Sequence, residues 1–129
     1  MAKEAVMIQN APKPAGPYSH GVAAAGLLFT AGFGPQDPAT GEVVPGGVYE
    51  QTQQVLRNVR SVLEAKGASF DDVVKVTAHL QHLKRDFAEY NRAYGEFFAE
   101  PYPVRTTVGS DLYDILVEID VVAVLPEGR

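Results

Sequence analysis

The sequence predicts an α+β fold in which two helices pack on one face of a mostly antiparallel sheet. Apolar residues recur at helical spacing in two stretches, one starting at Val48 and one at Asp86, and residues 73–83 between them alternate with period two. The expected order of elements is β, ββ, α, β, α, ββ. Because no repeat, low-complexity tract or linker divides the 129 residues, we expect a single domain over residues 1–129.

Short strands separated by turn residues are expected in the N-terminal third. Residues 5–8 form an apolar patch that predicts a first strand. Residues 18–24 and 27–32 predict two further strands joined by a tight turn at Ala25-Gly26. Proline and glycine are frequent between residues 37 and 47, which predicts a loop before the first helix.

The first helix is predicted by an amphipathic stretch that begins at Val48 and stops at Gly67. Polar side chains such as Glu50 and Arg57 occupy its other face. This pattern indicates a helix with one buried stripe. The stripe consists of Val48, Val55, Leu56, Val59, Val62 and Leu63.

The second helix is expected to begin at Asp86, which we assign as its N-cap, and to end before Pro101 and Pro103. Residues 104–109 and 115–125 are rich in β-branched side chains and predict the last two strands. The apolar side of the second helix consists of Phe87, Tyr90, Tyr94, Phe97 and Phe98.

The strand at residues 73–83 has two different faces. Its apolar face consists of Val74, Val76, Ala78 and Leu80, and its polar face of Lys75, Thr77, His79 and Gln81. The strand at residues 115–125 likewise mixes Glu118 and Asp120 with apolar neighbours. Such a face is either solvated or covered by another subunit, and we expect a homo-oligomer interface.

The composition excludes several classes of function. The chain has no cysteine, which removes disulfides, thiolate nucleophiles and cysteine-based metal sites. A net charge of −5 without a block of lysine or arginine disfavours nucleic acid as a partner. The sequence shows neither an apolar run long enough for a membrane span nor a secretory signal, so we expect a cytoplasmic protein. His20, His79 and His82 form no metal-binding pattern, and we expect no metal.

Arg105 and Glu118 are the candidate catalytic residues. Arg105 lies just inside a strand that follows two prolines, and Thr107 shares its face. Its guanidinium could bind a carboxylate ligand in a bidentate manner or pair with an Asp or Glu of a neighbouring strand. Glu118, among apolar neighbours, could be an ion-pair partner or a general base beside a bound water.

Six stretches in order across nearly the whole chain resemble the Rid family (reactive intermediate deaminase, YjgF-like). They are Asn10-Ala11-Pro12 with Gly16-Pro17-Tyr18-Ser19-His20-Gly21-Val22, then Phe29-Thr30-Ala31-Gly32, Gln54-Val55-Leu56-Arg57-Asn58-Val59, Phe87-Ala88-Glu89-Tyr90-Asn91, Pro103-Val104-Arg105-Thr106-Thr107-Val108 and Val117-Glu118-Ile119-Asp120-Val121-Val122-Ala123. The resemblance implies a chorismate-mutase-like subunit that forms a homotrimer. The sheets would form a central barrel, and the active sites would lie in clefts between subunits.

The resemblance also implies roles for individual residues. Arg105 would bind the carboxylate of an imino or enamino acid, and Glu118 would help to position the attacking water. Tyr18 and Asn91 would lie at or near the site, to which Gly32 and Thr107 would contribute backbone groups. No cofactor is implied. The sequence departs from well-studied members at Ala31, Phe33 and Thr107, which should alter the shape of the pocket more than the reaction.

The expected function is therefore hydrolysis of 2-imino acids, such as 2-iminobutanoate and 2-iminopropanoate, to 2-keto acids and ammonia. An imine carbon is electrophilic once its nitrogen is protonated, so orienting the substrate and a water is the main requirement. Two alternatives stay open. One is a module that binds a keto acid for sensing without turnover, and the other is the endoribonuclease activity attributed to some family members, against which the acidic charge weighs.

Overall fold

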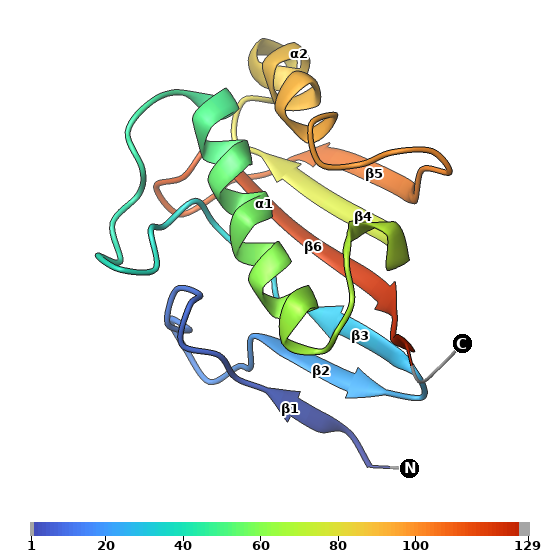
Figure 1. Cartoon of the computed structure of the whole chain (residues 1–129). Helices are drawn as coiled ribbons and strands as arrows, with labels where there is room; N and C mark the ends of the chain where they lie inside the picture. The colour runs from blue at the N-terminus through green and yellow to red at the C-terminus, as the bar shows by residue number, and fades with distance from the viewer. Residues whose placement is uncertain (1, 127–129) are drawn as a thin grey trace.

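The computed structural model describes residues 2–126. The strands form one six-stranded sheet in the order β1-β2-β3-β6-β4-β5, and two helices cover one face of this sheet (Figure 1). The elements are β1 (Glu4–Val6), β2 (Gly21–Ala24), β3 (Leu27–Thr30), α1 (Val48–Ala65), a 3₁₀ turn (Phe70–Asp72), β4 (Val73–Leu80), α2 (Leu83–Tyr94), β5 (Val104–Gly109) and β6 (Val117–Val124). The predicted α+β class and the predicted order of elements are confirmed.

All neighbouring strands are antiparallel except β4 and β5. The helix α2 connects these two, so β4, α2 and β5 form a βαβ unit at one edge of the sheet. A parallel pair needs such a crossover because the chain must return to the same end of the sheet before the second strand begins. The sequence did not predict this parallel pair, although the expectation of a mostly antiparallel sheet is confirmed.

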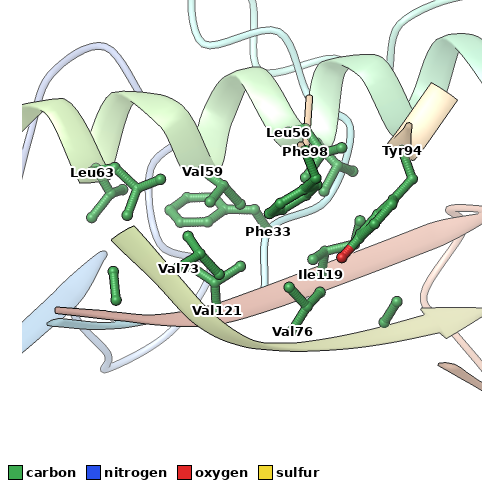
Figure 2. Close-up of a cluster of buried hydrophobic side chains, with 14 of the residues drawn as sticks. Phe33, Leu56, Val59, Leu63, Val73, Val76, Tyr94, Phe98, Ile119 and Val121 are labelled. Carbon is green, nitrogen blue, oxygen red and sulfur yellow. The ribbon is translucent and has the colours of Figure 1, made fainter. Parts of the chain in front are cut away.

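Both helices cover the same face of the sheet, and the core lies between them and the strands (Figures 1 and 2). The apolar stripe of α1 is buried, and α1 packs against β6, as the spacing of the stripe predicted. Burying a side chain of this size stabilises the fold by roughly 1.5–3 kcal/mol. Strands β4 and β6 contribute side chains to this core from the face that the helices cover. They are Val76, Ala78, Leu80, Val117, Ile119 and Val121.

Helix α2 starts earlier than predicted. Its N-cap is His82, and the backbone N–H of Asp86 already donates to the carbonyl of His82, so Asp86 lies within the first turn and the N-cap assignment was wrong. The Asp86 side chain is 10% exposed, and its carboxylate accepts two hydrogen bonds from Arg85. A carboxylate in this position also interacts favourably with the positive end of the helix dipole.

Strand β4 contains an irregularity that the alternating pattern did not reveal. The pairing with β6 shifts between Val73 and Lys75, so Val73 is buried whereas Val74 is 45% exposed. The prediction that Val74 belongs to the buried face was therefore wrong, because the extra residue of a bulge reverses the alternation on one side. The rest of β4 follows the predicted pattern, although the strand ends at Leu80 rather than at residue 83.

The first strand is shorter than predicted, because the chain leaves the sheet after Val6. The backbone N–H of Ile8 donates to Nδ1 of His20 instead of to a neighbouring strand. The N-terminal segment from Ile8 to Tyr18 is therefore attached to the sheet through a side chain, next to the start of β2.

Candidate active site

The register of three strands determines the face on which each candidate side chain lies. In the pairing of β4 with β5, Ala78 is opposite Thr107, and in the pairing with β6 it is opposite Ile119. Ala78 and Ile119 point into the core, so Thr107 and, two residues away, Arg105 lie on the face that carries the helices. Glu118 is opposite His79 and lies on the other face, away from α1 and α2 (Figure 1).

Arg105 lies against the aromatic side of α2. The guanidinium carbon is 4.6 Å from the ring centre of Tyr94, 5.3 Å from that of Tyr90 and 5.8 Å from that of Phe87. Its Nη1 donates to Oδ1 of Asn91 at 2.7 Å. These contacts orient the planar group by cation–π attraction and by one hydrogen bond.

No Asp or Glu among residues 2–126 lies within ion-pair distance of Arg105. The alternative role that the sequence offered for Arg105, a salt bridge to an Asp or Glu of a neighbouring strand, is therefore not observed in the described part of the chain. Burial raises the pKa of the Tyr94 hydroxyl to about 12 and also raises the pKa of Tyr90. Both phenols are neutral at physiological pH, so they do not neutralise the guanidinium.

A pocket of about 340 Å³ opens beside Arg105. Asn91 and Tyr94 of α2 form one wall, and Tyr102, from the segment that precedes β5, forms another. Thr107 does not line this pocket; its hydroxyl is hydrogen-bonded to the hydroxyl of the buried Tyr90 at 2.9 Å. The arginine side of the candidate site is thus an aromatic pocket with one cation.

Glu118 lines a different pocket, of about 480 Å³, on the open face of the sheet. Tyr18, Phe29 and Gly32 line the same pocket. A Cβ atom at position 32 would lie 2.6 Å from Oε1 of Glu118, so any larger residue there would displace the Glu118 side chain. The Glu118 side chain therefore lies directly against the Gly32 backbone.

The backbone on both sides of Gly32 is fixed. Ala31 donates its N–H to the carbonyl of His20, and Phe33 exchanges two backbone hydrogen bonds with Ile119. The Phe33 side chain is 5% exposed and packs in the core, where Figure 2 shows it below α1. Phe33 also lines a cavity that Gly32 and Glu118 share, so this departure from well-studied members affects both the core and a wall of that cavity.

The sequence-predicted residues fall into two groups. Asn91 and Arg105 come together in the pocket on the helix side, and Tyr18, Gly32 and Glu118 come together on the open side. Thr107 shares the helix side but contacts Tyr90 and does not line the pocket. Sequence reasoning missed the aromatic support of Arg105. A spacing of three and four residues between Phe87, Tyr90 and Tyr94 was visible, but it was interpreted only as a buried stripe.

Residues 2–126 hold neither a metal-binding cluster nor a membrane-spanning helix. Residues 2–126 contain no group of three or more histidine and carboxylate side chains arranged to bind a metal ion. Within the same range, neither helix is long and apolar enough to cross a membrane.

These features define a single-sheet α+β protein with an arginine pocket on the helix side and a glutamate pocket on the open side. The family model described as Endoribonuclease L-PSP matches residues 8–125. The chain therefore belongs to this family, the Rid or YjgF-like family, as its motifs indicated.

Individual relatives agree with this assignment over nearly their full length. A RutC family protein of Pyrococcus horikoshii is 46% identical over 123 residues, which are 94% of this chain and 97% of that protein. The structure of E. coli TdcF with bound serine has a TM-score of 0.86 and 36% identity, covering 94% of this chain and 98% of that one. RidA from the Antarctic bacterium Psychrobacter has a TM-score of 0.89 and 31% identity, with coverage of 95% and 99%.

Proposed function

We propose that the chain hydrolyses small 2-imino acids to 2-keto acids and ammonia, and that it does so in sites formed between neighbouring copies of a homotrimer. The proposal rests on the surroundings of the Arg105 guanidinium. Its guanidinium is oriented by three rings and Asn91, has no carboxylate partner among residues 2–126, and borders a pocket. A cation prepared in this way suits the carboxylate of a small ligand.

The position of Glu118 supports a site between chains. Arg105 and Glu118 of one chain lie on opposite faces, and their strands are two places apart in the sheet, roughly 10 Å. One small substrate therefore does not reach both groups of the same chain. If the open face of one copy meets the β5 edge of another, Glu118 and Arg105 can border a common cleft.

The open face has the composition expected of such a contact. Phe29, Val104 and Val108 are large apolar side chains that are more than a third exposed, and the registers place all three on this face. Lys75, Thr77 and Asp120 form a polar part of the same surface. The sheets of three copies would then enclose the barrel that the family resemblance implies.

In the proposed reaction, Arg105 binds the carboxylate and the imine nitrogen is protonated. Glu118 accepts a proton from water as the water oxygen bonds to C2, which gives a carbinolamine. Glu118 then returns that proton to the nitrogen, and the C2–N bond breaks with its electron pair leaving on ammonia. The hydroxyl proton is released as the carbonyl forms, so the net reaction consumes one water.

The bound serine in TdcF is consistent with a ligand of this size. Serine carries a carboxylate and a nitrogen on the same carbon, as a 2-imino acid does, and the TdcF structure is similar to 94% of this chain. Binding without turnover is the principal competing function. Endoribonuclease activity is suggested by the description of the family model, but the net charge of −5 disfavours binding of a polyanion.

The test couples an amino-acid oxidase, which generates the imine in place, to trapping with semicarbazide. We expect the protein to lower semicarbazone formation and to raise the rate of ammonia release. Arg105→Ala and Glu118→Gln should lose the effect. Arg92→Ala is the matched control, because Arg92 lies on the exposed side of α2 and pairs with Glu89 at 2.8 Å.

The outcomes separate the competing functions. A protein that binds 2-oxobutanoate in calorimetry but leaves the semicarbazone yield unchanged would be a binding module. Cleavage of a single-stranded RNA oligonucleotide that Glu118→Gln abolishes, without imine hydrolysis, would support the endoribonuclease instead.

A further inference from the structure

His20 is a buried titratable residue to which the proposed reaction assigns no role. It directly precedes β2, and its side chain is 2% exposed. Nδ1 accepts a hydrogen bond from the backbone N–H of Ile8 at 3.0 Å, and Nε2 lies 2.7 Å from the carbonyl oxygen of Pro12. Because a carbonyl only accepts and an N–H only donates, these partners fix the neutral tautomer with its proton on Nε2.

The same residue contacts both neighbours of Gly32. The carbonyl of His20 accepts the N–H of Ala31 at 2.9 Å. Its ring stacks on Phe33 with the ring centres 5.9 Å apart and the planes 27° apart. Gly32, between these two residues, lies against the Glu118 carboxylate so closely that it leaves no room for a Cβ atom.

His20 also attaches the N-terminal segment that borders the Glu118 pocket. Pro12, Lys13 and Ala15 line a cavity that Glu118 and Gly32 share. Ala15 further donates its N–H to the hydroxyl of Tyr18 at 3.0 Å. Removal of the imidazole would leave the Ile8 N–H and the Pro12 carbonyl without partners, and the segment would have to move to find water.

We propose that His20 is a positioning residue, which holds Gly32 and the N-terminal segment so that Glu118 keeps the place needed to orient the water. The inference rests on the function proposed above. His20 does not touch substrate in this scheme. It acts through its contacts with Ile8, Pro12 and Phe33, and its loss should affect the rate of the chemical step more than the binding of the carboxylate.

The experiment compares His20→Leu with two conservative variants in the full chain. Leucine removes both hydrogen bonds, whereas His20→Asn can keep an acceptor near the place of Nδ1 and His20→Gln can keep a donor near that of Nε2. Leu63→Ala is the control, because Leu63 is fully buried in α1 and contributes to stability without the contacts of His20. Each variant is measured for urea unfolding, kcat and KM on an imine generated in place, and the amide resonance of Gly32.

We expect His20→Leu to lower kcat by roughly 10- to 100-fold, since small misplacements of a reacting group have effects of this size. KM should change by less than about threefold, because Arg105 makes the carboxylate contact. The Asn and Gln variants should recover part of kcat, the Gly32 resonance should move in His20→Leu, and Leu63→Ala should lose stability without losing kcat.

A folded His20→Leu variant with the kcat of the wild type would overturn the inference. So would an equal loss of kcat in Leu63→Ala, or values of kcat that follow stability alone across all four variants. If His20→Leu does not fold, the Asn and Gln variants provide the same comparison. If the wild type shows no turnover, the proposed function fails, and the Gly32 resonance still decides whether His20 holds Gly32.

Discussion

The Cα of Gly32 lies so close to the Glu118 carboxylate that a Cβ atom at this position would be 2.6 Å from Oε1. The contact joins the end of β3 to β6 on the open face of the sheet. A substitution at Gly32 therefore gives a direct means of displacing the Glu118 carboxylate without removing it.

Gly32→Ala should therefore lower kcat while the chain still folds. The new methyl group forces the Glu118 side chain to rotate away, and a displaced base loses much of its effect, roughly 10- to 100-fold. Gly16→Ala is the matched control, because its Cβ atom would be 3.8 Å from the Tyr18 ring, an ordinary contact distance. Steady-state kinetics on an imine generated in place would measure both, and equal rates in the two variants would contradict the role of this contact.

Arg105→Ala should lower kcat/KM by roughly 100-fold or more, because two charge-assisted hydrogen bonds to the carboxylate are lost. Arg105→Lys should recover little, since an ammonium lacks the planar fork that contacts three rings and Asn91. Imines made from alanine or leucine should be substrates, whereas imines of simple amines should not. Equal rates with and without a substrate carboxylate would argue against the assignment of Arg105.

Glu118→Gln keeps the shape of the side chain but removes its basicity. The rate should fall by roughly 10²- to 10⁴-fold if Glu118 is the general base, and affinity for a 2-keto acid should change much less. Stopped assays for ammonia and calorimetry with 2-oxobutanoate measure these two quantities separately. An unaffected rate in Glu118→Gln would remove the glutamate from the mechanism.

Assembly through the open face predicts that two inactive variants complement each other. When Arg105→Ala and Glu118→Gln chains are mixed in equal amounts and refolded together, on the order of one quarter of the sites should combine an intact Arg105 with an intact Glu118. Light scattering should give about three times the 13.9 kDa of one chain. A monomer at micromolar concentration, or no recovery of activity in the mixture, would show that the site is not shared between chains.

Asp120 should make stability depend on pH. Burial raises the pKa of its carboxyl, although the charges of His79 and Lys75 act in the opposite direction. Just above pH 3.8, the ordinary pKa of an aspartate, the folded chain keeps a proton on Asp120 that the unfolded chain has lost. The free energy of unfolding therefore falls as pH rises through this range, and it stays lower at higher pH.

Asp120→Asn should therefore raise the urea midpoint of unfolding above that of the wild type at neutral pH. The difference between the two midpoints should disappear as the pH is lowered below 3.8, the ordinary pKa of an aspartate. Asp111→Asn, in an exposed loop, serves as the control. Urea unfolding at pH 7 and pH 3 provides the comparison. A stabilisation of the same size at both pH values would show that the effect does not come from the charge.

The sequence determined the elements whose pattern is local. The stripe of α1 is buried as its spacing predicted, because a helix with apolar residues at every third or fourth position has one way to bury them. Alternation likewise predicted that Arg105 and Thr107 share a face and that His79 lies opposite the core. The family followed from six short motifs in order.

Tertiary structure decided which residues meet. Alternation says which side chains of one strand share a face, but the pairing of distant strands decides whether that face points toward the helices. The parallel pairing of β4 with β5 therefore placed Arg105 beneath α2, and the pairing of β4 with β6 placed Glu118 on the other side. His20 could not be assigned from the sequence for the same reason, since its partners, Ile8, Pro12 and Phe33, become neighbours only when the sheet forms.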